Sequence, residues 1–290
     1  MRFFTGLKNL WHRLTQKSST DVAKVAFITA IYGDYEASCK KFASQSISTD
    51  FICFTNNPEI KANGWIIDTT PYHKTHPSPV DQKTYVNSLH NNTHTFNIAK
   101  YYKQNFYHIP RLQQYEVIIW VDGTIEITHP DCVKYALSIL KDYSIITMEN
   151  ECLTGKLKDE VKLSIPYRYY STHWFGQDQP YQDLAAQYKA YVQSGYKDAF
   201  WKKYKPSYTN ANIYGMWCTC LVVFDMRYEK MKDFLDFWYL QTLQYSTQDQ
   251  MGFPFALQKK NIIPYTWPDY YVQGKSHSKT DFYIKHEHGN

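Results

Sequence analysis

The most informative segment of the chain is Tyr115-Glu116-Val117-Ile118-Ile119-Trp120-Val121-Asp122-Gly123-Thr124-Ile125-Glu126-Ile127. Its apolar run over 117–121 is typical of a strand buried on both faces of a parallel sheet. An aspartate and a glycine follow directly, at the strand end where open α/β sheets bind ligands. A carboxylate exposed there suits a divalent cation, although Asp-Gly after a strand is also a common turn. Asp122 is therefore the first candidate site residue.

Elements of the same kind extend outward from this strand in both directions. Apolar strands are predicted over residues 25–31, 50–56 and 65–68, and the first two end in polar turn residues. A helix is predicted over 92–107, directly before the strand at 117–121. This alternation predicts a parallel sheet with crossover helices. Helices over 181–195 and 228–245 and a strand over 216–226 complete one α/β domain, residues 21–290, with a mostly parallel central sheet flanked by helices.

Composition narrows the class of protein. The chain has 290 residues, of which 43% are hydrophobic and 20% charged, so it can bury a full core. Its formal charge of +5 is spread along the sequence without a basic stripe, which argues against nucleic acid as a partner and is compatible with a small anionic ligand. The six cysteines lack CxxC spacing and are interpreted as reduced thiols. Neither a membrane span nor a signal peptide is evident, so we expect a cytoplasmic location.

Residues 1–20 form a distinct leader. They carry Arg2, Lys8, Arg13 and Lys17 and no acid, with apolar residues at roughly helical spacing. The pattern predicts a basic amphipathic helix. One interpretation is peripheral contact with an anionic membrane surface, and the other is a helix packed on the body of the protein or a frayed end.

Four short blocks follow one another in order between residues 25 and 257. They are Thr29-Ala30-Ile31-Tyr32-Gly33-Asp34-Tyr35, Phe54-Thr55-Asn56, Trp120-Val121-Asp122-Gly123 and Gln248-Asp249-Gln250. Together they resemble the blocks of the TOD/MUCI-type glycosyltransferase-like family, and the segment 118–127 resembles the metal-binding strand of GT-A glycosyltransferases. Three positions depart from the family pattern: Thr124 stands where the second acid of Asp-x-Asp is expected, Asn56 replaces an acid and Gln248 replaces a cation.

The resemblance implies a GT-A glycosyltransferase, either a hexosyl- or a pentosyltransferase. Such an enzyme would move a sugar from a nucleotide-diphosphate donor, expected to be a UDP-sugar, to a hydroxyl of a glycan or lipid-linked acceptor. The expected cofactor is Mn²⁺ or Mg²⁺, which would neutralise the charge that develops on the β-phosphate. Its expected ligands are Asp122 and a C-terminal histidine, with His277 as first candidate and His286 and His288 behind it.

Further site residues are expected around the ends of the first strands. The candidates for contact with the nucleotide are Thr29, Ala30, Ile31, Tyr32, Thr55, Asn56, Lys100, Asp122 and Gly123. Tyr32 would stack on the base, and Lys100 would reach a phosphate unless it is merely solvated.

Asp249 is the candidate catalytic residue. It would accept the proton of the acceptor hydroxyl in an inverting reaction or orient the acceptor in a retaining one, whereas the structural alternative is a helix cap. Trp174 and Trp217 are candidates for an acceptor platform, with burial in the core as the alternative.

Two rival functions remain open at this stage. The missing second acid and the aromatic excess of 27 Tyr, 16 Phe and 8 Trp favour a non-catalytic carbohydrate- or nucleotide-sugar-binding module. A glycoside hydrolase would use Asp122 together with Glu126 or Asp249. A nucleophile elbow, a phosphate loop and a dinucleotide fingerprint are absent from the sequence, which argues against serine hydrolases, phosphate-loop kinases and dinucleotide oxidoreductases. Donor sugar, acceptor and stereochemical outcome stay open.

Overall fold

The computed structural model describes residues 23–33, 35–72, 95–150, 155–168, 173–174, 177–178, 183–204, 215–272, 275–277 and 282–287. The predictions for the leader, residues 1–20, and for His288 lie outside the described residues. For Trp174 and His277 the structure describes the backbone.

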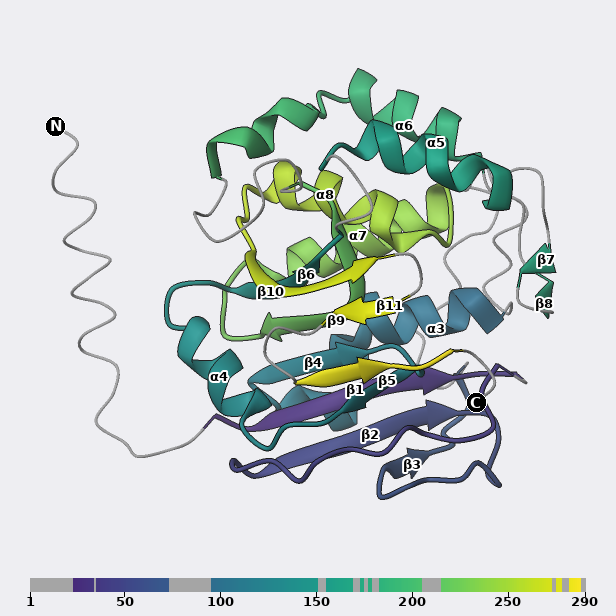
Figure 1. Ribbon diagram of the computed structural model, residues 1–290, viewed down its shortest axis with the longest axis vertical. Coiled ribbons are helices and arrows are strands. Elements are labelled where there is room, and N and C mark those ends of the chain that lie inside the picture. Colours follow the sequence, from purple (N-terminus) through teal and green to yellow (C-terminus); the bar gives the residue numbers. More distant parts are fainter. Residues whose placement is uncertain are drawn as a thin grey trace, which may run out of the picture.

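The described part of the chain is organised around one eight-stranded sheet (Figure 1). Its order is β11-β10-β6-β9-β4-β1-β2-β3. The bounds are β1 (Val25–Ile31), β2 (Thr49–Thr55), β3 (Ile66–Asp68), β4 (Val117–Val121), β6 (Ile145–Glu149), β9 (Trp217–Asp225), β10 (Tyr265–Val272) and β11 (Lys275–His277). All the strands except β9 and β11 run in one direction. Two small sheets join β5 (Ile125–Ile127) to β12 (Tyr283–Lys285) and β7 (His173–Trp174) to β8 (Gln177–Asp178).

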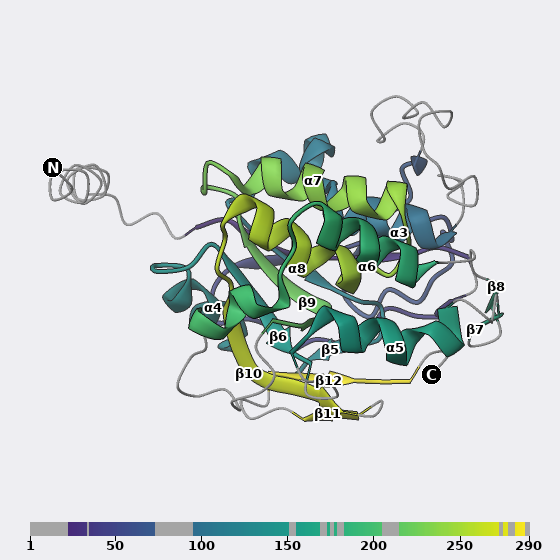
Figure 2. The same ribbon diagram turned by 90° about the horizontal axis from the view of Figure 1, so that it is seen from above.

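Helices cover both faces of the sheet (Figures 1 and 2). One face packs against α3 (Thr95–Gln104), α7 (Met231–Gln244) and α8 (Asp249–Lys260). The other face packs against α4 (Cys132–Ile139) and the β5–β12 pair. The helices α5 (Leu157–Arg168) and α6 (Leu184–Gln193) lie outside the sheet layers and pack on α8. Short 3-10 segments are η2 (Phe106–His108), η3 (Pro110–Gln114) and η4 (Asp198–Tyr204).

The central strand β4 shows how the two cores arise. Every residue of β4 is buried, and successive side chains point to opposite faces. Ile118 and Trp120 join the cluster under α3, α7 and α8, whereas Val117, Ile119 and Val121 join the cluster under α4. A continuous apolar run is what a strand covered on both sides requires, which confirms the buried strand predicted at 117–121.

The α/β class and the mostly parallel sheet are confirmed, with one addition that the pattern did not reveal. The long strand β9 lies antiparallel between β4 and β6. A strand buried on both faces is continuously apolar whichever way it runs, so the run over 216–226 predicted the strand but not its direction. Within the described residues, the helix predicted over 92–107 is present as α3 and ends at Gln104, before the 3-10 segment η2.

Two predictions about the whole chain can be compared with the described part. Its five cysteines are free thiols: Cys39, Cys53, Cys132, Cys218 and Cys220. None of the described helices is long and apolar enough to cross a membrane.

Candidate functional site

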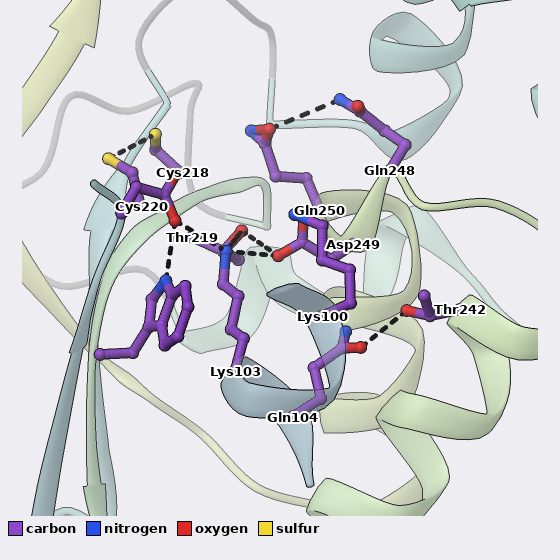
Figure 3. A network of polar contacts seen from close by, with 12 residues as sticks. Lys100, Lys103, Gln104, Cys218, Thr219, Cys220, Thr242, Gln248, Asp249 and Gln250 are labelled. Carbon is purple, nitrogen blue, oxygen red and sulfur yellow. Dashed lines mark hydrogen bonds and ion pairs between the residues drawn. The ribbon is translucent and has the colours of Figure 1, made fainter. Parts of the chain in front are cut away.

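Four charged side chains form one network at the carboxyl end of β4 (Figure 3). Lys103 Nζ lies 2.5 Å from Asp249 Oδ2 and 3.5 Å from Asp122 Oδ1. Lys100 Nζ lies 2.8 Å from Asp249 Oδ1. The buried ammonium of Lys103 therefore links the carboxylates of Asp122 and Asp249, which lie far apart in the sequence. With Lys100, the network has two positive and two negative charges.

Helix α3 supplies both cations. Lys100 and Lys103 are three residues apart and so project from the same side of the helix. The helix is anchored to the core by Tyr101 and Tyr102, which are fully buried. The anchored helix delivers Lys103 into the interior, where 1% of its side chain is exposed, and leaves Lys100 at the rim with 18% exposed.

Asp122 is placed by β4 and the turn that follows it. Alternation puts its side chain on the same face as Trp120, whose Nε1 donates to Asp122 Oδ1 at 2.7 Å. The Asp122 N–H donates to the carbonyl of Cys220 at 2.8 Å, which extends the β4–β9 ladder by one residue. The next residue, Gly123, is closely packed: a Cβ there would lie 3.2 Å from a side-chain carbon of Ile31 and 3.4 Å from one of Glu36, so a larger residue would crowd both side chains.

An irregularity in β9 brings a hydroxyl into the network. Thr147 of β6 pairs with Val222 of β9, but the next β6 residue, Met148, pairs with Cys218. The β9 strand therefore has extra residues between these two pairs. Such a bulge changes which face the following side chains occupy. Thr219 consequently faces α3, where its Oγ1 accepts from Lys103 at 3.1 Å and donates to Asp249 Oδ2 at 2.8 Å. Figure 3 shows Thr219 between Lys103 and Asp249.

Asp249 is the first residue of α8, and its carboxylate does not serve as a helix cap. The N-cap residue is Gln248, which makes no side-chain capping bond, and Ser246 donates instead to Gln187 at 2.6 Å. The Asp249 carbonyl accepts from Trp238 Nε1 at 2.9 Å, which fixes the start of the helix. The capping interpretation of this carboxylate is therefore wrong: its oxygens accept from two ammonium groups and one hydroxyl.

The electrostatics of the network keep both acids ionised. Burial by itself would raise the pKa of Asp249, but the ammonium groups of Lys100 and Lys103 outweigh that effect and hold it well below its usual range. The same opposition gives Asp122 a lowered pKa. Burial would lower the pKa of Lys103, yet the two carboxylates raise it above its usual value. Lys100 has a lowered pKa because burial outweighs the attraction of Asp249.

These protonation states bear on the role of Asp249. A general base works best when its pKa lies near the operating pH. The carboxylate of Asp249 is 8% exposed and its pKa is shifted the opposite way, so it is poorly suited to accept a proton from an acceptor. We interpret Asp249 as the anchor that orients the two lysines.

Asp122 and Lys100 are the most exposed members of the network. The side chain of Asp122 is 38% exposed, and its described contacts, from Trp120 and Lys103, both fall on Oδ1. Oxygen Oδ2 is thus available to a sugar hydroxyl or a cation. In the described part Lys100 has one acceptor, Asp249 Oδ1, so further N–H donors can meet an anion.

The ends of β1 and β2 adjoin this network but offer little side-chain surface. Thr29 and Ile31 are buried, as is Thr55, whose hydroxyl accepts from the Asn57 N–H at 3.1 Å. Ala30 is partly exposed, and Asn56 is exposed and accepts from the Gly33 N–H at 3.1 Å, tying the two strand ends together. Their contact with a nucleotide stays a prediction.

Two aromatic candidates are already engaged within the protein. Tyr32 is 6% exposed, stacks on Tyr102 and donates to its hydroxyl at 2.9 Å, so the structure gives no free ring face for a base. Trp217 is fully buried and donates to Thr266 at 3.0 Å. The prediction that Trp217 forms an acceptor platform is wrong, because the whole indole lies in the core. Trp174 stays a prediction.

The described residues do not assemble the metal centre expected at Asp122. They contain no group of three His, Cys, Asp or Glu side chains placed to hold a metal ion. Thr124, in place of the second acid, is 1% exposed, and the ring of His286 is engaged by Glu126 at 2.7 Å. One carboxylate oxygen of Asp122 is the ligand available, and it lies beside the Lys103 ammonium. This set does not fit a resident divalent cation; His277 as a ligand stays a prediction.

The C-terminal segment approaches the carboxyl end of β4 through His286, which was a later candidate than His277 for a metal ligand. The N–H of His286 donates to the Thr124 carbonyl at 2.9 Å, directly after the β5–β12 pairing. The sequence signal for this approach was weak, because a terminal His-Glu-His is typical of a solvated tail.

Two members of the network, Lys103 and Thr219, were not assigned a role from sequence. The spacing of Lys100 and Lys103 on a predicted helix was a usable signal for the first. No sequence signal identified Thr219, because its orientation depends on the β9 bulge.

Comparisons with known proteins bear on the fold. No protein-family model matches the chain, and no curated protein matches it. Among solved structures, the WbbM bifunctional glycosyltransferase in apo form gives a TM-score of 0.50 at 11% identity, covering 86% of this chain and 40% of that one. Mouse xyloside xylosyltransferase 1, apo form, gives 0.47 at 7% identity, covering 84% of each chain. Core-mannan synthase A from Aspergillus fumigatus, in a Mn/GDP form, gives 0.39 at 11% identity, covering 83% and 71%.

The first of these likenesses defines the class of fold. It shows that the chain has a GT-A-like glycosyltransferase fold, as the sequence predicted. The chain spans 40% of the length of that WbbM chain, so it corresponds to a part of it. The more specific resemblance to the TOD/MUCI-type family has no family-model match to support it.

Proposed function

We propose that this protein is a glycosyltransferase that moves a sugar from a nucleotide-diphosphate donor, expected to be a UDP-sugar, to a hydroxyl of a glycan or lipid-linked acceptor. The observation that carries the proposal is the Lys100–Asp249–Lys103–Asp122 network at the carboxyl end of β4. In open α/β sheets this edge is where ligands bind, and a GT-A-like fold places the network there.

The exposed members of the network match the two halves of such a donor. A diphosphate is an anion, and Lys100 offers N–H donors at the rim. A sugar presents hydroxyl groups, and Asp122 Oδ2 is an ionised acceptor for them. Asp249 and Lys103 hold these two groups in a fixed relative position, which lowers the cost of organising the site for catalysis.

The hydrolase alternative is weakened by the same network. A glycoside hydrolase needs one carboxylic acid with a raised pKa that protonates the leaving group. Asp122 and Asp249 both have lowered pKa values, and Glu126 is engaged by His286. Asp122 and Asp249 therefore do not form the pair of an ionised and a neutral carboxyl group that a hydrolase needs.

The described tryptophans do not support the alternative of a non-catalytic sugar-binding module. All six tryptophans whose side chains the structure describes are buried: Trp65, Trp120, Trp201, Trp217, Trp238 and Trp267. They stabilise the two cores and do not form an exposed platform for sugar rings.

The proposal is tested by incubating the protein with a panel of nucleotide-diphosphate sugars and measuring nucleoside diphosphate release by chromatography, without metal and with Mn²⁺ or Mg²⁺. We expect one donor to be turned over, and Asp122→Asn to reduce that turnover. The matched control is Asp233→Asn, which removes the carboxylate of the surface pair Lys260–Asp233 and should change nothing. Turnover of none of the donors, together with no binding of any nucleotide, would refute the proposal.

We also propose that the protein acts in the cytoplasm, peripherally at a membrane through its leader, residues 1–20. The basic, acid-free composition of the leader supports attraction to anionic lipids, and a lipid-linked acceptor would be reached from such a position.

A further inference from the structure

We infer that this site binds its donor without a divalent cation, with Lys100 as the group that contacts the diphosphate and Lys103 as a fixed positive charge beneath it. The inference rests on the proposed function and specifies how the site recognises its substrate. It departs from the sequence prediction of a Mn²⁺ or Mg²⁺ centre and follows from how the described donors and charges are arranged.

The position of the missing second acid cannot supply a ligand. Thr124 is 1% exposed, and its carbonyl is already bonded to the N–H of His286. Mg²⁺ in proteins is usually held by one or two carboxylates, with waters and substrate phosphates as its other ligands. Asp122 offers one oxygen, Oδ2, because its Oδ1 accepts from Trp120 and from Lys103, and the ammonium of Lys103 already supplies a positive charge to this carboxylate.

Lys103 is fully committed to the protein. Its Nζ contacts three acceptors, Asp249 Oδ2, Thr219 Oγ1 and Asp122 Oδ1, which match its three N–H donors. The side chain is 1% exposed, and Nζ lies 5.6 Å from the ring centroid of Trp120. Lys103 therefore cannot contact substrate directly. Its positive charge is shared between the two carboxylates, Asp249 and Asp122.

Lys100 is placed differently. It has one described acceptor, Asp249 Oδ1 at 2.8 Å, and 18% of its side chain is exposed. Two of its three N–H donors therefore remain for phosphate oxygens. The two lysines and two carboxylates balance in charge, so the network needs no divalent cation for neutrality, and an incoming diphosphate can meet the Lys100 ammonium at the rim.

The chemistry balances without a metal. The bond between the anomeric carbon and the β-phosphate oxygen breaks, and its electron pair remains on that oxygen, so the nucleoside diphosphate leaves with one more negative charge. The acceptor oxygen forms the new bond to the anomeric carbon and releases its proton to water. Lys100 stabilises the charge that develops on the phosphate, which is the contribution expected of an electrostatic catalyst placed at a leaving group.

The test is isothermal titration of the full chain with five nucleoside diphosphates (UDP, GDP, ADP, CDP and dTDP), each in excess EDTA and in excess MgCl₂ or MnCl₂. We expect one nucleotide to bind in EDTA with nearly the same affinity as with metal. Lys100→Met should weaken that binding by about tenfold to a hundredfold, because a hydrogen bond to a charged group contributes roughly 1.5–3 kcal/mol. Lys100→Arg should restore most of it, and the matched control Lys260→Met, on the surface pair with Asp233, should leave it unchanged.

The outcomes separate the two proposals. Binding that appears only with metal overturns this inference, whatever the effect of Lys100→Met, and leaves the glycosyltransferase proposal standing. Binding of no nucleotide under any condition overturns both. The comparison of EDTA with metal uses the unaltered protein, so it decides the question even if a Lys100 variant fails to fold.

Discussion

Replacing Lys103 with methionine is expected to destabilise the protein far more than a surface lysine replacement. Methionine keeps most of the apolar stem but removes the ammonium that contacts Asp249 at 2.5 Å and Asp122 at 3.5 Å. Removing one partner of a buried ion pair typically costs about 3–5 kcal/mol, because the other charge stays buried without its partner. Asp249 keeps Lys100 and Thr219, so we expect a value near the lower end, about 3 kcal/mol.

The expected shift in melting temperature follows from chain length. Unfolding entropies of roughly 2.1 cal/mol/K per residue give about 0.6 kcal/mol/K for 290 residues, so Lys103→Met should lower the melting temperature by about 5 °C. Differential scanning calorimetry measures this shift. Lys260→Met is the control, because its pair with the 64%-exposed Asp233 should contribute less than about 1 kcal/mol.

A double variant distinguishes charge from packing. If Lys103 acts through Asp249, then Lys103→Met combined with Asp249→Asn should cost less than the two single changes together, because the unpaired carboxylate is gone. The reasoning is refuted if Lys103→Met melts like the wild type, or if the two changes add without any coupling.

Further expectations concern pH, packing and the leader. The pKa of Asp249 is lower in the folded protein than its unfolded value of 3.8, so its ionised carboxylate stabilises the fold above pH 3.8 and loses this effect as the pH falls through the folded pKa. The melting temperature measured against pH should therefore show the wild type losing its advantage over Asp249→Asn below about pH 4. Trp217→Ala should cost about 3–5 kcal/mol in denaturant unfolding, and wild-type stability would restore the platform interpretation. Deleting residues 1–20 should abolish recovery with anionic liposomes while leaving donor hydrolysis intact; equal recovery would remove the membrane proposal.

Much of the fold could be predicted because burial dictates sequence along the central strands. The run at 117–121 is apolar throughout because both of its faces are covered, and β1 and β2 follow the same rule. The direction of β9 could not be predicted in this way. A strand in the middle of a sheet is buried on both sides whether it runs parallel or antiparallel to its neighbours. Its hydrophobic pattern is therefore the same in both cases and does not indicate the direction.

The site was predictable in part for a similar reason. Asp122 and Asp249 stood out because an acid at a strand end or a helix start is visible in one short segment. Lys103 and Thr219 matter only because α3 and the bulge in β9 bring them together from distant parts of the chain. Tyr32 and Trp217 were assigned to ligands because aromatic rings suit them, but the same rings suit a core, and burial decides between the two.

The most direct measurement is a crystal structure of the full chain grown with the tightest-binding nucleoside diphosphate and with EDTA. We expect the diphosphate at the carboxyl end of β4, with a phosphate oxygen within hydrogen-bond distance of Lys100 Nζ, the sugar side open to Asp122 Oδ2, and the Lys103 contacts to both carboxylates retained. A nucleotide bound away from this edge of the sheet, or one that contacts neither Lys100 nor Asp122, would contradict this expectation.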